Sequence, residues 1–338
     1  MGSRLTKVMA QSLNNLSPGA QFYQIGDKLK LALDGLGPVG DIYWLDPTNG
    51  DDGNDGSAPD SAKKTLAAGY ALLRDGRNDT LVYMAGTSGI SLAAGFTWAK
   101  SYAHLVGACA PVPWSPRSRI FLAAGTASQT FLFKVTGQGC IFENLLFFMG
   151  VNDATAAHAV ELSSTAHRNF FKACHVAGIG HATMDVAGAG SLKLDGASEN
   201  LFEDCVIGLD TITRTTSTHE LLFDSAASRN TFRRSTFHAY IGAAGHALVE
   251  IADATGIDRV QKFEACHFIA DSVNRATALT EVFKIPAGIS QGMIDLDAEC
   301  HVSSWGSAAA WDSNSRGIIS AAMVAPQASA AGGISTHQ

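Results

Sequence analysis

The sequence lacks the features that define several common classes of protein. Only 16% of its 338 residues are charged, and the formal net charge is −7. This argues against a nucleic-acid-binding surface, which is normally basic. No run of eighteen apolar residues occurs, so no membrane-spanning helix is expected. The first residues contain no apolar stretch long enough for a signal peptide, which favours synthesis in a cytoplasm without export.

The six cysteines form no CxxC pair, and this excludes zinc ribbons and thioredoxin-like motifs. Buried free thiols that pack as small apolar groups are expected instead. Regularly spaced leucines are missing, and no helical period of apolar residues fills the chain. Leucine-rich and ankyrin-type repeats are therefore disfavoured, although 46% of the residues are hydrophobic and can form a large core.

One short pattern recurs at intervals of 29, 31, 30 and 31 residues. Its anchors are Phe142, Phe171, Phe202, Phe232 and Phe263. Three positions later stand Leu145, Cys174, Cys205, Ser235 and Cys266. The segments are short and rich in aromatic and β-branched residues, which predicts strands. A unit of this length cannot bury its own apolar face, so the units must stack. The sequence predicts an all-β protein, a parallel β-helix with one coil per repeat.

The positions at and after each anchor predict a bend and an outer row of charges. Inward-facing residues at zero, plus three and plus five cannot share one straight strand, because side chains alternate along a strand. We therefore expect a bend at plus one and plus two. The plus-one residues alternate in sign: Glu143, Lys172, Glu203, Arg233 and Glu264. Each exposed pair would contribute at most about 1 kcal/mol, so the main effect of such a ladder would be on register.

Asparagine stands two positions before three of the anchors, at Asn169, Asn200 and Asn230. Stacked asparagines hydrogen-bond along a solenoid axis and tolerate left-handed backbone at corners. Gln261 stands two positions before its anchor and could extend the same row. A structural role is predicted for these residues in preference to a ligand site.

Four regions are expected: an N-terminal arm (1–40), a strand–helix–strand module with the first coils (41–110), the β-helix (111–305) and an extended tail (306–338). In the module, we predict strands at 42–45 and 80–84 and a helix from about Ala62 to Leu73, capped by Ser61 or Asp60. The preceding loop holds four acids, Asp46, Asp51, Asp52 and Asp55. Their spacing does not match an EF-hand, which favours a surface loop over a calcium site.

A family resemblance rests on the order of these segments. The strand, NGDDGNDG, PDSAKKTL, the helix and LVYMAG together resemble the N-terminal module of the pectate-lyase-like right-handed parallel β-helix superfamily. HLVGA (104–108) and CIFENLLF (140–147) resemble its early coils. The resemblance covers residues 40 to 300 and implies a right-handed β-helix whose first coil is covered by a short helix. The superfamily includes lyases, hydrolases, adhesins and bacteriophage virion proteins, so it implies a fold more strongly than an activity.

Catalysis on a polysaccharide would require clustered carboxylates. If the chain is an enzyme, Asp195, Asp204 and Asp224 are the candidates, but no catalytic pattern of the family carries over onto them. The chain is therefore expected not to be an enzyme and to need no cofactor and no metal. His175, His267 and His301 share one repeat position, but the first two lie three coils apart, about 14 Å at strand spacing, which is too far for a shared metal.

Two functions are compatible with these features. The favoured hypothesis is a structural bacteriophage virion protein, a homotrimer that decorates the capsid or forms a short spike and binds other virion proteins through its terminal arms. It would be localised to the virion. The alternative is a tailspike-like protein that binds or cleaves surface polysaccharide. Exposed aromatics beside two carboxylates would support that alternative, and the aromatics to inspect are Trp98, Trp114 and Trp305.

Overall fold

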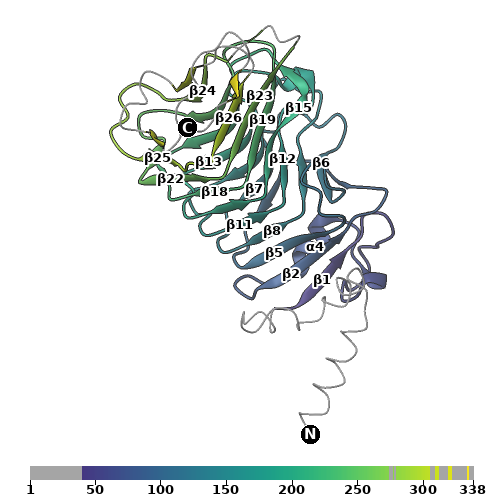
Figure 1. Cartoon of the computed structure of the whole chain (residues 1–338). Coiled ribbons are helices and arrows are strands. Elements are labelled where there is room, and N and C mark those ends of the chain that lie inside the picture. Colours follow the sequence, from purple (N-terminus) through teal and green to yellow (C-terminus); the bar gives the residue numbers. More distant parts are fainter. Residues whose placement is uncertain are drawn as a thin grey trace.

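A computed structural model describes residues 40–273, 277, 279–304, 309–311, 319–321 and 333–334. The predicted arm, apart from residue 40, and most of the predicted tail lie outside the described residues. The described chain winds into a solenoid of stacked strands (Figure 1). No helix among the described residues is long and apolar enough to cross a membrane.

Three sheets run along the solenoid, and each complete coil, from β2 to β27, adds one strand to each of them. Sheet A contains β1 (Ile42–Leu45), β2 (Asp79–Met84), β5 (Ala103–Ala108), β8 (Ile141–Glu143), β11 (Phe170–Lys172), β14 (Leu201–Glu203), β18 (Thr231–Arg233), β22 (Val260–Glu264), β25 (Met293–Leu296) and β28 (Ile319–Ala321). Sheet B contains β3 (Ile90–Leu92), β6 (Arg119–Leu122), β9 (Leu146–Phe148), β12 (His175–Ala177), β15 (Val206–Arg214), β19 (Thr236–Ile241), β23 (His267–Ser272), β26 (His301–Ser304) and β29 (Gly333–Ile334). Sheet C contains β4 (Phe96–Trp98), β7 (Phe131–Val135), β10 (His158–Leu162), β13 (Gly190–Asp195), β16 (His219–Asp224), β20 (Ala247–Ile251), β24 (Glu281–Lys284) and β27 (Ala309–Trp311).

The strand pairs that build the coils are parallel, which confirms the predicted parallel β-helix. A further short ladder joins β17 (Ala227–Ser228) and β21 (Ile257–Asp258). Near the end of the chain, β27 and β28 continue sheets C and A in parallel, whereas β29 pairs with β26 antiparallel.

The core contains a column of stacked phenylalanines on sheet A. The five anchor residues pair in register from β8 to β22, and all are buried. Neighbouring rings lie 4.6 to 5.0 Å apart between centroids, with interplanar angles of 11 to 24°. Offset aromatic pairs contribute about 0.5–1.5 kcal/mol each beyond the area that they bury. The column therefore stabilises both the core and the register between coils.

A single residue turns the chain from sheet A into sheet B, and not the two residues predicted, because the plus-one residue still belongs to the strand of sheet A. In five successive coils the residue two positions after the phenylalanine has φ between 47° and 56°: Asn144, Ala173, Asp204, Arg234 and Ala265. This left-handed conformation breaks the alternation of the strand. Its N–H also pairs with the next coil, as in the 2.9 Å bond from Ala173 to the Glu203 carbonyl.

The helix of the N-terminal module is shorter than predicted. α4 (Leu66–Leu72) begins after Thr65, whose Oγ1 accepts a hydrogen bond from the Ala68 N–H at 3.2 Å. The prediction of a start at Ala62 capped by Ser61 or Asp60 was wrong, because Pro59–Ser61 forms a separate 3-10 turn, η1. Ser61 donates to the Asp55 carboxylate at 2.9 Å instead of capping the helix. The helix packs next to β1 at the N-terminal end of the solenoid (Figure 1).

The acidic loop of this module is held by its own hydrogen bonds. Asp52 accepts from the N–H groups of Lys64 and Thr65 at 2.9 and 2.8 Å, and Asp46 accepts from Thr48 and Asn49 at 2.8 and 3.0 Å. Within the described residues, no group of three or more His, Cys, Asp or Glu side chains is arranged to hold a metal ion. These carboxylates therefore stabilise the conformation of the loop by accepting backbone hydrogen bonds.

Candidate functional site

The outer face of sheet A carries the alternating charges. In register across β8, β11, β14, β18 and β22 stand Glu143, Lys172, Glu203, Arg233 and Glu264. Arg233 lies 3.1 Å from a carboxylate oxygen of Glu203 and 2.8 Å from one of Glu264. Lys172 lies in register between Glu143 and Glu203.

Two further rows of ion pairs were missed by the sequence reasoning. On the outer face of sheet C, contacts of 2.7 to 2.9 Å join Lys134 to Glu161, Lys193 to Asp224 and Lys284 to Glu250. At the corner between sheets C and A, Glu199 pairs with Arg168 at 2.7 Å and with Arg229 at 3.3 Å. For the corner row the thirty-residue spacing was the available signal, because Arg168, Glu199 and Arg229 each stand three positions before an anchor.

The three candidate catalytic acids do not form one site. Asp195 lies opposite Asp224 on neighbouring strands of sheet C, and Asp224 is paired with Lys193 at 2.9 Å. Asp204 stands at the bend between sheets A and B, where Arg234 binds it at 2.8 Å. Asp204 and Asp224 are thus held in ion pairs, and Asp204 lies apart from the in-register neighbours Asp195 and Asp224.

The asparagines form a continuous hydrogen-bonded row inside the solenoid. Asn200 Oδ1 accepts from the Asn169 N–H at 2.9 Å, and Asn200 Nδ2 donates to Asn230 Oδ1 at 2.9 Å. Asn230 Nδ2 in turn donates to Gln261 Oε1 at 3.1 Å. All four side chains are buried. Gln261 thus occupies the position of a fourth asparagine.

The buried cysteines also have a polar function. All six cysteines are free thiols. Cys174, Cys205 and Cys266 lie one position after the left-handed residue, and their Sγ atoms lie 3.3–3.5 Å from the carbonyl oxygen of the phenylalanine one coil earlier. Ser235 makes the equivalent bond with its hydroxyl at 3.2 Å. Four of the five coils therefore have a small donor at this position, a property that the expectation of small apolar groups did not include, whereas the first coil has Leu145 there.

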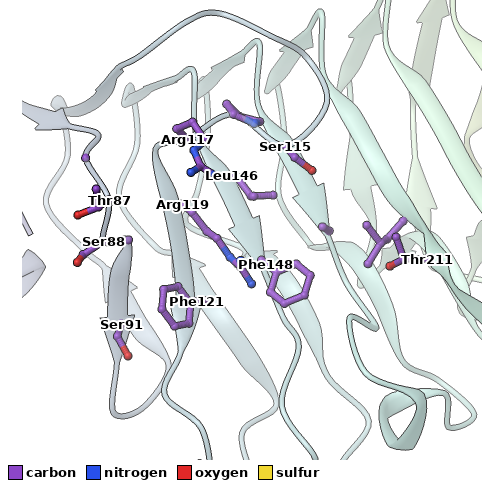
Figure 2. A pocket seen from close by; sticks show the side chains of 15 residues that line it. Thr87, Ser88, Ser91, Ser115, Arg117, Arg119, Phe121, Leu146, Phe148 and Thr211 are labelled. Carbon is purple, nitrogen blue, oxygen red and sulfur yellow. The ribbon is translucent and has the colours of Figure 1, made fainter.

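A groove of about 640 Å³ crosses the outer face of sheet B at its first coils (Figure 2). Its floor consists of Phe121, Phe148, Leu146, Ala177 and Leu209. Hydroxyl groups surround this floor: Thr87, Ser88, Ser91, Ser115 and Thr211. Arg117 and Arg119 supply the charge, and no Asp or Glu is among the lining residues.

Arg119 lies at the centre of the groove. Its guanidinium carbon is 4.1 Å from the ring centroid of Phe148 and 5.0 Å from that of Phe121. Figure 2 shows the side chain extending between the two rings. Its Nε is buried and lacks a hydrogen-bond partner among the described residues. Burial lowers the pKa of Arg119, and the nearby charge of Arg117 lowers it further.

A histidine fixes one wall of the groove. His175 Nδ1 accepts from the Ser115 N–H at 3.0 Å, and its Nε2 lies 2.8 Å from the Gly208 carbonyl oxygen. This arrangement requires the neutral imidazole with its proton on Nε2. Burial lowers the pKa of His175, which favours that form. Trp114 packs edge-on against His175 and His238, with centroid distances of 6.0 and 5.3 Å.

The three tryptophans named from the sequence have different environments. Trp114 is 44% exposed, whereas Trp98 is fully buried in the core and packs on Tyr70. Trp305 lies outside the described residues. Only Trp114 therefore remains as a described surface aromatic from that set.

Sequence reasoning also missed a buried ionic cluster that joins β15 of sheet B to β16 of sheet C. Arg214 and Glu220 are fully buried, and their side chains lie 3.0 Å apart. Ser191 donates to the same carboxylate. Burial raises the pKa of Glu220, and the Arg214 charge opposes that rise. Nearby, His158 and His219 stack with Nε2 atoms 2.8 Å apart. Arg214 ends the bulged strand β15, so the cluster belongs to an insertion and has no thirty-residue signature.

GISQG (288–292) fits the G-x-S-x-G pattern of hydrolases. That pattern acts as a nucleophile elbow when it joins a strand to a helix. Here it forms a turn between the strands β24 and β25, with Ser290 exposed. The structural context of the elbow is therefore missing.

The fold and groove define an all-β parallel β-helix protein with one non-acidic outer groove. No family model matches the chain, and no curated protein matches it. Similar solved structures include pectin methylesterase PemA from Erwinia chrysanthemi (12% identity, TM-score 0.48, 78% of this chain and 82% of that one). Pectate lyase Pel9A has 14% identity and a TM-score of 0.48, covering 76% of this chain and 68% of that one. A pectin methylesterase bound to a hexasaccharide has 13% identity and a TM-score of 0.47, covering 72% and 78%. The fold assignment itself rests on the strand registers.

Proposed function

We propose that the protein is a non-catalytic structural component of a bacteriophage particle. In this role it is a homotrimer that decorates the capsid or forms a short spike and binds other virion proteins through its terminal segments. The observation that carries the non-catalytic part is the pairing of two of the three candidate acids with basic side chains. Asp204 and Asp224 are each within 2.9 Å of a basic side chain, and they stand on different faces of the solenoid.

The rows of ion pairs and the asparagine row support a mechanical role. They link every neighbouring pair of coils from β8 to β22 through side chains as well as through strand pairing. Such repeated contacts favour one register over a shifted one. A rigid and register-locked rod suits a particle component that must keep its length and orientation.

Two measurements test this proposal. Mass spectrometry of density-purified phage particles should detect the chain in a fixed ratio to the capsid protein. The purified protein, incubated with a panel of polysaccharides, should release neither new reducing ends nor unsaturated uronates. Turnover that disappears in Asp195→Asn and Asp224→Asn variants, while an Asp258→Asn surface control retains it, would contradict the non-catalytic role.

The second candidate function is the binding of a polysaccharide without cleavage. The groove on sheet B favours it, because aromatic and hydroxyl side chains line the groove and no carboxylate is among the lining residues. Aromatic faces and hydroxyls contact the apolar and polar parts of a small ligand. A spike that adheres to a cell surface would combine this activity with the structural role.

A further inference from the structure

The arginines of the groove differ from most of the other described arginines, which are held in ion pairs. Seven of those have a carboxylate oxygen within 3.3 Å: Arg74, Arg168, Arg214, Arg229, Arg233, Arg234 and Arg259. Among the described residues, Arg117 and Arg119 have no carboxylate at ion-pair distance, although the chain holds 31 acidic and only 24 basic residues. The groove thus concentrates unpaired positive charge on an acidic protein.

Arg119 is also held in one position before any ligand binds. Its guanidinium packs on Phe148 and Phe121, and contacts of this kind are attractive because the ring faces are negative. A planar guanidinium in a fixed orientation matches a carboxylate through two parallel hydrogen bonds. Because the side chain is already ordered, less conformational entropy is lost on binding.

The rest of the lining identifies the kind of molecule that carries the anion. Leu146, Ala177 and Phe148 present an apolar floor, and Ser88, Ser91 and the other hydroxyls stand around it. A sugar ring has an apolar face of C–H groups and a rim of hydroxyls, so it complements both parts of the lining. A free inorganic anion would use the arginines and leave the apolar floor without a partner.

We propose that the groove on sheet B binds a carboxylate-bearing sugar unit of an acidic polysaccharide. The ring lies against Phe148 and Leu146, and the carboxylate binds Arg119, with Arg117 adding to the attraction. This inference deepens the polysaccharide-binding candidate and rests on it. It does not depend on the role in the particle.

The test compares two hexasaccharides that differ in one group per ring. A β-1,4-linked glucuronic acid hexamer carries a carboxylate where cellohexaose carries a hydroxymethyl group. Isothermal titration at low salt should show binding of the glucuronate hexamer at least tenfold tighter than that of cellohexaose. Arg119→Gln should weaken glucuronate binding tenfold or more, because it removes the charge and the two-pronged donor. Arg77→Gln, which changes an exposed arginine outside the groove, should leave it unchanged.

Two further variants separate recognition from folding. Arg119→Lys keeps the charge but loses the planar fork, so it should bind more weakly than the wild type and more strongly than Arg119→Gln. The unfolding midpoints of both variants should stay close to that of the wild type.

Four results would overturn the inference. Equal binding of the two hexamers would show that the carboxylate is not recognised. If Arg119→Gln left glucuronate binding intact, the ligand would bind elsewhere on the protein. Only the more general proposal, that the protein binds polysaccharide, would then remain. Binding of inorganic sulfate or phosphate as tight as that of glucuronate would make the groove a simple anion site. Failure of every sugar to bind would remove the inference and the polysaccharide-binding candidate together.

Discussion

Replacing Asn200 by alanine should destabilise the solenoid far more than an ordinary polar substitution. Asn200 accepts from the Asn169 N–H at 2.9 Å and donates to the Ala166 carbonyl at 3.0 Å and to Asn230 Oδ1 at 2.9 Å. The site is buried, so no water replaces these partners. A stranded buried donor costs about 1–3 kcal/mol and each lost hydrogen bond about 1 kcal/mol. The free energy of unfolding should fall by about 3–5 kcal/mol.

Urea unfolding followed by far-ultraviolet circular dichroism measures this loss, and the comparison is valid where the m-values agree. Asn54→Ala is the matched control. Its side chain donates a single bond of 3.1 Å to the Ala62 carbonyl in a partly exposed loop, so its loss should cost about 1 kcal/mol or less. If Asn200→Ala loses no more stability than the control, the buried row does not hold neighbouring coils together, and the account of the fold is wrong.

Three further predictions follow from single positions. Ser235→Cys should change the free energy of unfolding by less than about 1 kcal/mol, whereas Ser235→Ala should lower it by about 1–2 kcal/mol. The reason is that only the cysteine keeps a donor to the carbonyl of the preceding coil. The urea midpoints of the two variants measure the difference. Arg214→Met should lower the free energy of unfolding by about 3–5 kcal/mol, because it leaves Glu220 buried and unpaired. Adding Glu220→Leu should restore most of this loss. Equal losses in the single and double variants would show that the buried pair is not coupled. Burial lowers the pKa of His104 to about 4, below its unfolded value of 6.5. The buried neutral imidazole of His104 therefore contributes about 3 kcal/mol to the free energy of unfolding above pH 6.5. This contribution is lost as the pH falls from 6.5 towards 4, because the unfolded state then binds a proton that the folded state does not. His104→Gln should reduce the difference between urea midpoints at pH 7.5 and pH 4.5.

The coil and its repeating contacts could be predicted because each repeated residue meets its own counterpart in the next coil. The phenylalanine column needed only the thirty-residue interval. The existence of a bend followed from parity alone, but the structure confines it to the plus-two residue, such as Ala173 and Asp204, and keeps the plus-one residue in the strand. A contact that repeats in every coil places similar residues at a fixed interval in the sequence. That interval can be recognised without a structure.

The groove could not be predicted because its lining does not repeat. Arg119 lies opposite Leu146 on the next strand, so no ladder signature marks it. Ser88 and Ser115 come from loops of two different coils, and Thr211 comes from the bulged part of β15 in a third, so their convergence depends on how these segments fold over sheet B. The buried pair of Arg214 and Glu220 has the same origin, since it follows the bulge in β15.

Cryo-electron microscopy of the phage particle that carries this chain tests the central claim most directly. The proposal predicts regular rod-shaped density on the capsid or at a short spike, into which three copies of the β-helix fit with the terminal segments at the attachment point. Particles that contain no such density, together with a purified protein that cleaves polysaccharide, would contradict a structural and non-catalytic role.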